Sequence, residues 1–225
     1  MEREVIKFLK RKGAWEMKMI KNFILMVLLA GGFFVSTYGQ ANESVKYTIL
    51  PQSKLYIDGT STFHNFTINA KEVSGYLVLN KVEQNGNAKA VLDNMSEMKV
   101  VVPVKKLDTD KSSMNDNMDD ALKADKAPDI TYELKSVESG KISNNPNDPG
   151  KFITTGNLTI AGVSKQIEMP VDGYIGKDGN LYFKGEETVK MTDYGVKPPT
   201  MFFGTIKTGD AVVVHFDLVL STENN

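Results

Sequence analysis

Two histidines, His64 and His215, are the first candidates for a functional site, because imidazole can bind a metal or move a proton near neutral pH. His215 and Asp217 are two positions apart, so on a strand they leave the same face, which also carries valines. We interpret that face as a solvent-facing strand surface. His64 follows Asp58 in a Thr- and Asn-rich segment and is interpreted as a structural hydrogen-bonding residue. Zinc needs three or four ligands at short spacing, so we predict no metal site.

The sequence motifs of the common enzyme classes are absent. The chain has no G-x-S-x-G elbow, no P-loop and no dinucleotide fingerprint. It has no cysteine, which excludes disulfides, thiolate metal sites and a cysteine nucleophile. Segment 143–150 is rich in Asn, Asp and Pro and lacks the ligand spacing of known calcium loops, so we predict a solvated loop. We predict no catalytic residue and no cofactor, and a hydrolase or metalloenzyme is the third and least favoured hypothesis.

The elements that would position any site are strands, and the clearest two lie within residues 151–175. Apolar or small residues alternate with polar ones along both runs, which predicts two strands with one buried face each. The first face holds Phe152, Thr154, Gly156, Leu158 and Ile160, and the second holds Ile167, Met169, Val171, Gly173 and Ile175. Between them, Gly162 can adopt the positive φ that a tight hairpin requires.

Similar alternation recurs through the rest of the chain and is clearest in residues 212–220, where every second residue is apolar. Many short strands separated by Gly or Asn clusters predict an antiparallel sandwich or barrel. A closed barrel also removes the open sheet edges that another chain could pair with. We therefore predict an all-β fold.

Residues 113–123 break this rhythm with a helical period, and Met114, Met118 and Leu122 share one stripe. Ser113 and Asp116 have the spacing of a capping box, and acidic residues are expected near the helix start, where the helix dipole favours them. A helix this short must pack on the sheet to be stable. We expect it to close one end of the barrel or to cover one wall.

Four segments in the same order resemble the YceI-like family of small secreted bacterial barrels that bind polyisoprenoid lipids. Residues 156–165, GNLTIAGVSK, resemble its G-x-L-T-I-x-G-V-T/S-K signature, and residues 113–132 resemble its element running from helix to strand. Residues 191–199 resemble its D-F/Y-G-I loop, and residues 209–212 resemble its G-D-x-V entry to the last strand. The resemblance covers most of the chain from residue 47 to residue 220.

The resemblance implies an antiparallel lipocalin-like β-barrel of about eight strands with one short amphipathic helix. It implies a lumen that holds a long-chain amphiphile, of polyisoprenoid or isoprenoid-quinone type, without covalent chemistry. An arginine often found near the D-F/Y-G loop of relatives is replaced here by Lys190 and Lys197, so the resemblance carries no headgroup-binding arginine over to this chain. The alternative is a filled barrel that acts as a structural or protein-interaction module of the cell envelope, and a homodimer is left open.

The residues expected to line a lumen are the apolar faces of the predicted strands and the methionines of the predicted helix. They are Phe152, Leu158, Ile160, Ile167, Met169, Val171, Val214, Phe216, Leu218, Met114 and Met118. Seven methionines lie after residue 39; core packing is their favoured role, and an adaptable lining around a lipid chain is the alternative. An eight-stranded barrel can be filled by side chains or can hold one small ligand.

Residues 1–39 are predicted to be an N-terminal extension and a signal peptide, and residues 40–225 one barrel domain. Lys18 and Lys21 precede an unbroken run of 13 apolar or glycine residues and a small, polar exit, which are the three parts of a secretory signal. That run is shorter than the roughly 20 residues that span a bilayer. Cleavage is expected near Gly39, with Ala41 as the alternative, and the start codon is left open between Met1, Met17 and Met19.

The charge of the predicted mature chain argues against a nucleic-acid partner. Of 27 basic and 28 acidic residues, seven and three lie in residues 1–39, which leaves 20 and 25, a formal charge of −5. All 20 basic residues are lysine. Nucleic-acid binding favours a basic surface. The absence of cysteine also excludes a lipoprotein anchor, so we expect no permanent membrane anchor and a periplasmic or secreted protein.

Overall fold

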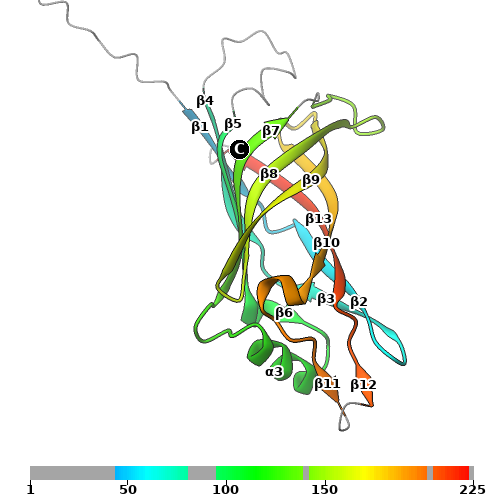
Figure 1. The fold of residues 1–225 in the computed structure, drawn as a ribbon. Coiled ribbons are helices and arrows are strands. Elements are labelled where there is room, and N and C mark those ends of the chain that lie inside the picture. The colour runs from blue at the N-terminus through cyan, green and yellow to red at the C-terminus, as the bar shows by residue number, and fades with distance from the viewer. Residues whose placement is uncertain (1–43, 81–94, 139–141, 202–204, 223–225) are drawn as a thin grey trace, which may run out of the picture. The chain divides into compact units, whose positions relative to one another are not determined.

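The computed structural model describes residues 44–80, 95–138, 142–201 and 205–222 (Figure 1). The predicted signal peptide and the domain boundary at residues 39 and 40 lie outside these residues. Within the described part of the chain, no helix is both long enough and apolar enough to cross a membrane.

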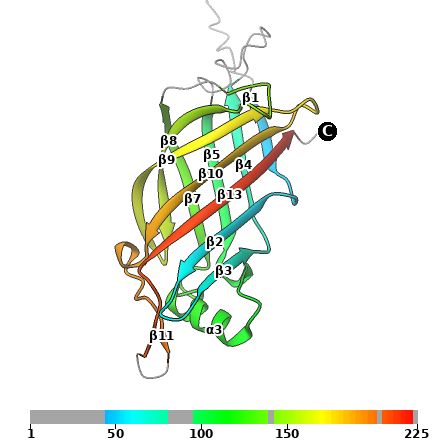
Figure 2. The same cartoon turned by 90° about the vertical axis from the view of Figure 1, so that its right-hand side faces the viewer.

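Eight antiparallel strands form a closed barrel, which confirms the predicted fold (Figures 1 and 2). In order around the barrel they are β1 (Ser44–Ile49), β4 (Ser74–Asn80), β5 (Met95–Pro103), β7 (Asp129–Glu138), β8 (Gly150–Ile160), β9 (Val163–Ile175), β10 (Leu181–Lys190) and β13 (Ala211–Thr222). The pairing of β1 with β13, in which Tyr47 lies opposite Thr222, closes the ring. Each neighbour in the ring therefore satisfies the backbone groups of the next.

The long strand β13 has two partners along one of its edges. Half of that edge pairs with β1, and the other half pairs with β2 (Lys54–Thr60), which continues into β3 (Asn65–Ala70) and the two-residue β6 (Leu107–Asp108). The change of partner occurs at Val219, whose carbonyl accepts a hydrogen bond from the Leu50 amide at 2.8 Å. Strands β2, β3 and β6 therefore extend the wall at one end of the barrel (Figure 2).

The hairpin of β8 and β9 forms as predicted. Ile160 lies opposite Val163, so the turn holds only Ala161 and Gly162. Their φ angles are 51° and 82°. Two positive φ values in a two-residue loop match the right-handed twist of the flanking strands, which is why a glycine is needed there.

One end of the barrel, here called the helix end, is built from the remaining elements (Figure 1). These are η1 (Val104–Lys106), α3 (Ser112–Ala121), η2 (Met191–Tyr194), β11 (Thr200–Met201) and β12 (Ile206–Lys207). Met118 of α3 is buried with Val102 and Leu107, and residues of β2, β3 and β7 pack around them. The helix therefore packs against the inner surface of the barrel wall, as its apolar stripe predicts.

The start of α3 differs from the prediction. The N-cap residue is Lys111, and no side chain caps the helix. The helix begins one residue earlier than expected, which places Ser113 inside its first turn. Asn115 instead ties this turn to the preceding loop, because its amide oxygen accepts from the Thr109 backbone at 2.9 Å and its amide nitrogen donates to Asp108 at 2.8 Å. The predicted capping box is wrong, and no acidic residue lies in the first turn of the helix.

Candidate ligand-binding lumen

A cavity of about 470 Å³ occupies the interior of the barrel. Side chains from strands of the ring, from β2 and β3, and from α3 and η2 line it, and most of them are aliphatic, aromatic or methionine. Its volume lies within the range of roughly 300–1,000 Å³ that is usual for ligand pockets. The barrel is therefore only partly filled by its own side chains.

The burial of inward-facing residues along β13 shows where side chains stop filling the barrel. Leu220 is 0% exposed, Leu218 is 3% exposed and Phe216 is 9% exposed, whereas Val214 and Val212 are only half-buried. The fully packed end, here called the closed end, also holds Leu181 and Ile142. Towards the helix end the same strand face borders open space.

Aromatic rings lie over glycines where the packed core meets the cavity. A Cβ at Gly185 would lie 2.6 Å from the Phe216 ring, and a Cβ at Gly156 would overlap the ring of Tyr132. Both glycines therefore leave room for an aromatic ring close to the strand backbone. The rings of Phe152 and Phe183 meet edge to face at 6.0 Å nearby, so aromatic side chains form the inner limit of the cavity.

All eleven residues predicted from the sequence to line a lumen do line this cavity. They come from β8 (Phe152, Leu158, Ile160), β9 (Ile167, Met169, Val171), β13 (Val214, Phe216, Leu218) and α3 (Met114, Met118). Their role as ligand contacts stays a prediction. Six of the seven methionines after residue 39 also border the cavity, so they lie where an adaptable lining would be needed.

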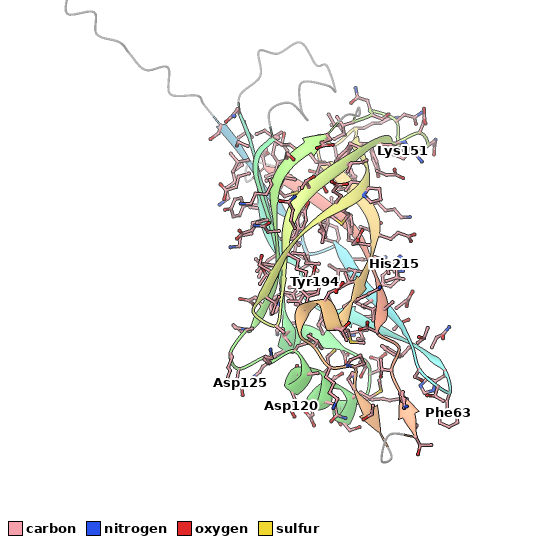
Figure 3. All side chains as sticks on the ribbon, in the orientation of Figure 1. Phe63, Asp120, Asp125, Lys151, Tyr194 and His215 are labelled. Carbon is pink, nitrogen blue, oxygen red and sulfur yellow. The ribbon has the colours of Figure 1, made fainter. Side chains whose placement is uncertain are left out.

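The cavity reaches solvent at the helix end. The exposed residues of its lining are His64, which follows β2, and Lys111, Ser113 and Asn117 at the start of α3. Phe63, in the turn between β2 and β3, is 68% exposed at this end (Figure 3). A molecule could therefore enter between this turn and α3.

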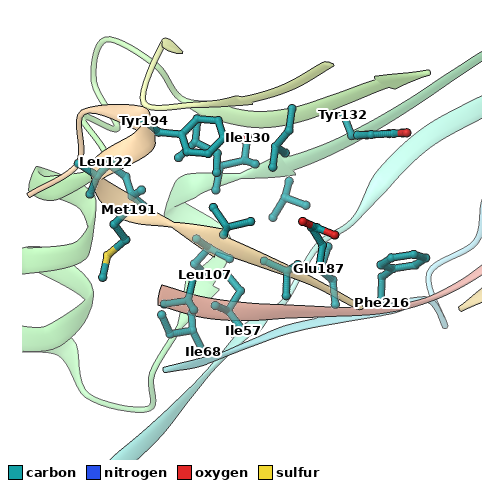
Figure 4. Close-up of a pocket in the computed structure, with 18 of the residues that line it drawn as sticks. Ile57, Ile68, Leu107, Leu122, Ile130, Tyr132, Glu187, Met191, Tyr194 and Phe216 are labelled. Carbon is teal, nitrogen blue, oxygen red and sulfur yellow. The ribbon is translucent and has the colours of Figure 1, made fainter. Parts of the chain in front are cut away.

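Three of the polar lining residues that sequence reasoning missed are Tyr132, Glu187 and Tyr194 (Figure 4). The Tyr132 hydroxyl donates to the Thr154 hydroxyl at 3.0 Å, and burial raises the pKa of Tyr132. Burial also raises the pKa of Tyr194. The sequence did hold a signal for Glu187, because Phe183 precedes it by four positions and alternation along a strand places both side chains on the same face.

The two histidines occupy different parts of the barrel. His215 faces outwards, where its Nε2 lies 3.4 Å from Asp58 and its Nδ1 lies 3.4 Å from Glu186, and its ring stacks on Tyr56 at 4.6 Å. His64 lines the opening of the cavity. Among the described residues, no group of three or more histidine or acidic side chains is placed to hold a metal ion.

Comparison with known proteins gives one family and several solved structures. A family model described as YceI-like domain matches residues 47–220. BcnA of Burkholderia cenocepacia superposes with a TM-score of 0.58 at 19% identity, covering 75% of this chain and 96% of that protein. A polyisoprenoid binding domain from Saccharophagus degradans superposes with a TM-score of 0.57 at 14% identity, covering 80% and 99%.

The YceI protein of Campylobacter jejuni superposes with a TM-score of 0.52 at 24% identity, covering 73% of this chain and 88% of that protein. No curated protein sequence matches the chain. At these identities the solved structures support the fold.

Proposed function

The chain belongs to the YceI-like domain family, and from that premise we propose that it carries one long-chain amphiphile, of polyisoprenoid or isoprenoid-quinone type, in its barrel. The apolar tail occupies the lumen, and no covalent chemistry takes place. A chain longer than the cavity continues through the opening at the helix end. The name of the Saccharophagus degradans neighbour, a polyisoprenoid binding domain, is in keeping with this proposal.

The observation that carries the proposal is the apolar cavity of about 470 Å³. An engineered apolar cavity of roughly 150 Å³ in another protein stays dry and binds benzene, so a space about three times larger should favour a larger apolar guest. Burial of such a guest contributes about 25 cal/mol per Å² of apolar surface before the costs of ordering it. A barrel that served as a filled structural module would have no use for this space.

Export is part of the same proposal. The signal-like segment before residue 40 would deliver the barrel to the periplasm or the medium, where a lipid needs a carrier between membranes. Isoprenoid chains are poorly soluble in water because their transfer from an apolar phase is unfavourable. A barrel that encloses the chain removes this apolar surface from water.

A matched pair of variants on β13 tests the proposal. Val214 lines the cavity, and its neighbour Val213 faces outwards beside Asp58. The variant V214F narrows the lumen, whereas V213F adds the same ring to the outer surface. We expect the prenyl alcohol geranylgeraniol to raise the unfolding midpoint of wild type and of V213F. At a ligand concentration of a hundred times Kd, the free energy of unfolding should rise by about 2.7 kcal/mol.

V214F should fold but should show a much smaller shift of its midpoint with the same alcohol. The ring enters open space, so the usual cost of about 1–3 kcal/mol for overpacking a core should be reduced. Equal shifts in both variants would place binding outside the lumen. No shift in wild type with any long-chain isoprenoid would favour the filled structural module.

A further inference from the structure

One carboxyl group projects into the apolar lumen. Glu187 lies on β10 opposite Val214, and its inward-facing neighbours on that strand are Gly185 and Val189. Figure 4 shows its carboxyl inside the cavity beside Phe216, with the Tyr132 ring on the opposite wall. The adjacent Glu186 faces outwards and contacts His215, so the two consecutive glutamates serve different faces of the barrel.

Within the described part of the chain, no side chain or backbone amide donates a hydrogen bond to Glu187, and no cation pairs with it. The other titratable groups of the lining are Tyr132, Tyr194, His64 and Lys111. Lys111 and His64 are exposed at the opening, and the Tyr132 hydroxyl is engaged with Thr154. Burial alone raises the pKa of Glu187, which favours the neutral acid in an apolar space.

We infer that Glu187 is a specificity-determining residue of the lumen, whose carboxyl hydrogen-bonds an uncharged oxygen function, a hydroxyl or a carbonyl, on the buried part of the ligand. This inference rests on the proposed function and names the chemical class within it. A neutral carboxyl can donate to a carbonyl and can both donate to and accept from a hydroxyl. The anionic form can still accept from a hydroxyl.

Glu187 would select among ligands because it is costly to leave its carboxyl without a hydrogen-bond partner. Without ligand, water that enters from the helix end can solvate the carboxyl. A pure hydrocarbon expels that water and returns no hydrogen bond, whereas an oxygenated chain returns one. A ligand with an anionic group at this depth would place that group beside the Glu187 carboxyl, with no cation to pair with it. Loss of a hydrogen-bond partner by a buried polar group weakens binding roughly five- to hundredfold.

The test compares farnesol with the hydrocarbon farnesene on wild type, E187L and E187Q. Binding is measured by displacement of an environment-sensitive apolar dye, and the quantity of interest is the ratio of the two Kd values. E187L should shift this ratio towards farnesene by roughly five- to hundredfold, because its side chain no longer needs a partner. E187Q should keep most of the wild-type preference, since its amide can still hydrogen-bond the hydroxyl. The outward-facing E186L is the matched control and should keep the wild-type ratio.

The outcomes separate this inference from the function on which it rests. Binding of both probes with the same ratio in wild type and E187L would overturn the role of Glu187 and leave lumen binding intact. Failure of wild type to bind either probe would overturn lumen binding and the inference together. Folding is not the obstacle, because E187L and E187Q both remove an ionisable group from an apolar space.

Discussion

Leucines in different parts of the barrel interior have different surroundings, although their chemistry is the same. Leu77 is 0% exposed in the packed core and does not border the cavity, whereas Leu158 is half-buried and lines it. The cost of truncating a leucine depends on how many packed neighbours lose contact. A comparison of the costs of truncating these two leucines therefore tests whether the lumen is open.

We predict that L77A lowers the free energy of unfolding by about 3–5 kcal/mol, and that L158A lowers it by about 1 kcal/mol without ligand. Chemical denaturation of both variants gives the comparison. Addition of a prenyl alcohol should enlarge the effect of L158A and leave that of L77A unchanged. Equal costs in the absence of ligand would mean that Leu158 is packed as tightly as Leu77.

Asp108 has the most strongly lowered carboxyl pKa that the structure indicates, at about 2. Hydrogen bonds from the Asn115 side chain and the Asp110 amide stabilise its charged form, and Lys71 lies 3.2 Å away. An unfolded aspartate titrates near 3.9. The folded state therefore binds fewer protons than the unfolded state between these values, so this contribution is complete above about pH 4 and is lost as the pH falls towards 2.

Removing the titrating group should remove this part of the pH dependence. We predict that the wild-type unfolding midpoint declines more steeply than that of D108N between about pH 4 and pH 2. The measurement is thermal unfolding across that range at constant ionic strength. Parallel curves for the two proteins would contradict the assigned pKa.

At the residue scale, the sequence predicted side chains that follow an apolar pattern and missed those that break it. Alternation placed Phe216 and Met169 on the inner face of the barrel, where the cavity lies, and the lumen itself was implied by the family resemblance. Glu187 was missed, because a second consecutive glutamate looks like a solvent-facing residue until its parity is followed. The contact of His215 with Asp58 joins β13 to β2, and spacing within one strand carries no information about pairing between strands.

At the scale of elements, α3 is held in place by its first turn as well as by its apolar stripe. Asn115 accepts from both the amide and the hydroxyl of Thr109 and donates to Asp108. These bonds connect the helix to the loop that follows β6. Residues at the start of α3 line the opening of the cavity, so the turn that Asn115 anchors is part of the entrance.

We predict that N115A loosens α3 and leaves the barrel strands intact. The loss of these bonds should lower the local stability of the helix by about 1–3 kcal/mol. Native-state hydrogen exchange would show it as faster exchange confined to α3. The control is N117A, at an exposed position on the same helix. Unchanged exchange in N115A would assign the anchoring of α3 to Met118 and its apolar contacts.

Long elements were predictable from the sequence, and short ones were not. Strands β8, β9 and β13 were recognised because runs of nine residues within them alternate with a period of two. The two-residue strands β6, β11 and β12 have no period to detect. The capping box failed because spacing alone does not specify which residue begins the helix, and here a loop contact made by Asn115 takes the place of the cap.

At the scale of the whole molecule, the barrel is closed by its first and last strands. Strands β1 and β13 lie at opposite ends of the domain sequence, and they pair with Ile49 opposite Leu220. A closed ring needs both strands, so the proposed cleavage must fall before β1. The proposed cleavage near Gly39 leaves Ser44 and the rest of β1 in place.

We predict that the exported protein begins close to residue 40. N-terminal sequencing of the protein from the cell envelope or medium should find a start near Gln40, or near Asn42 if cleavage follows Ala41. A mutation that introduces two charges into the apolar run, L28K/L29K, should keep the precursor inside the cell, because a signal peptide requires an uninterrupted apolar core. A mature protein that begins at Met1 or Met17 would contradict export by this segment.

Native mass spectrometry of the protein purified from its own host, without detergent or added lipid, tests the central claim most directly. The account predicts a non-covalent mass excess of one long-chain lipid that organic solvent releases intact. It predicts the same excess in V213F and a reduced excess in V214F, because only Val214 borders the cavity of about 470 Å³. A native mass equal to that of the polypeptide alone, with no lipid in the extract, would contradict it.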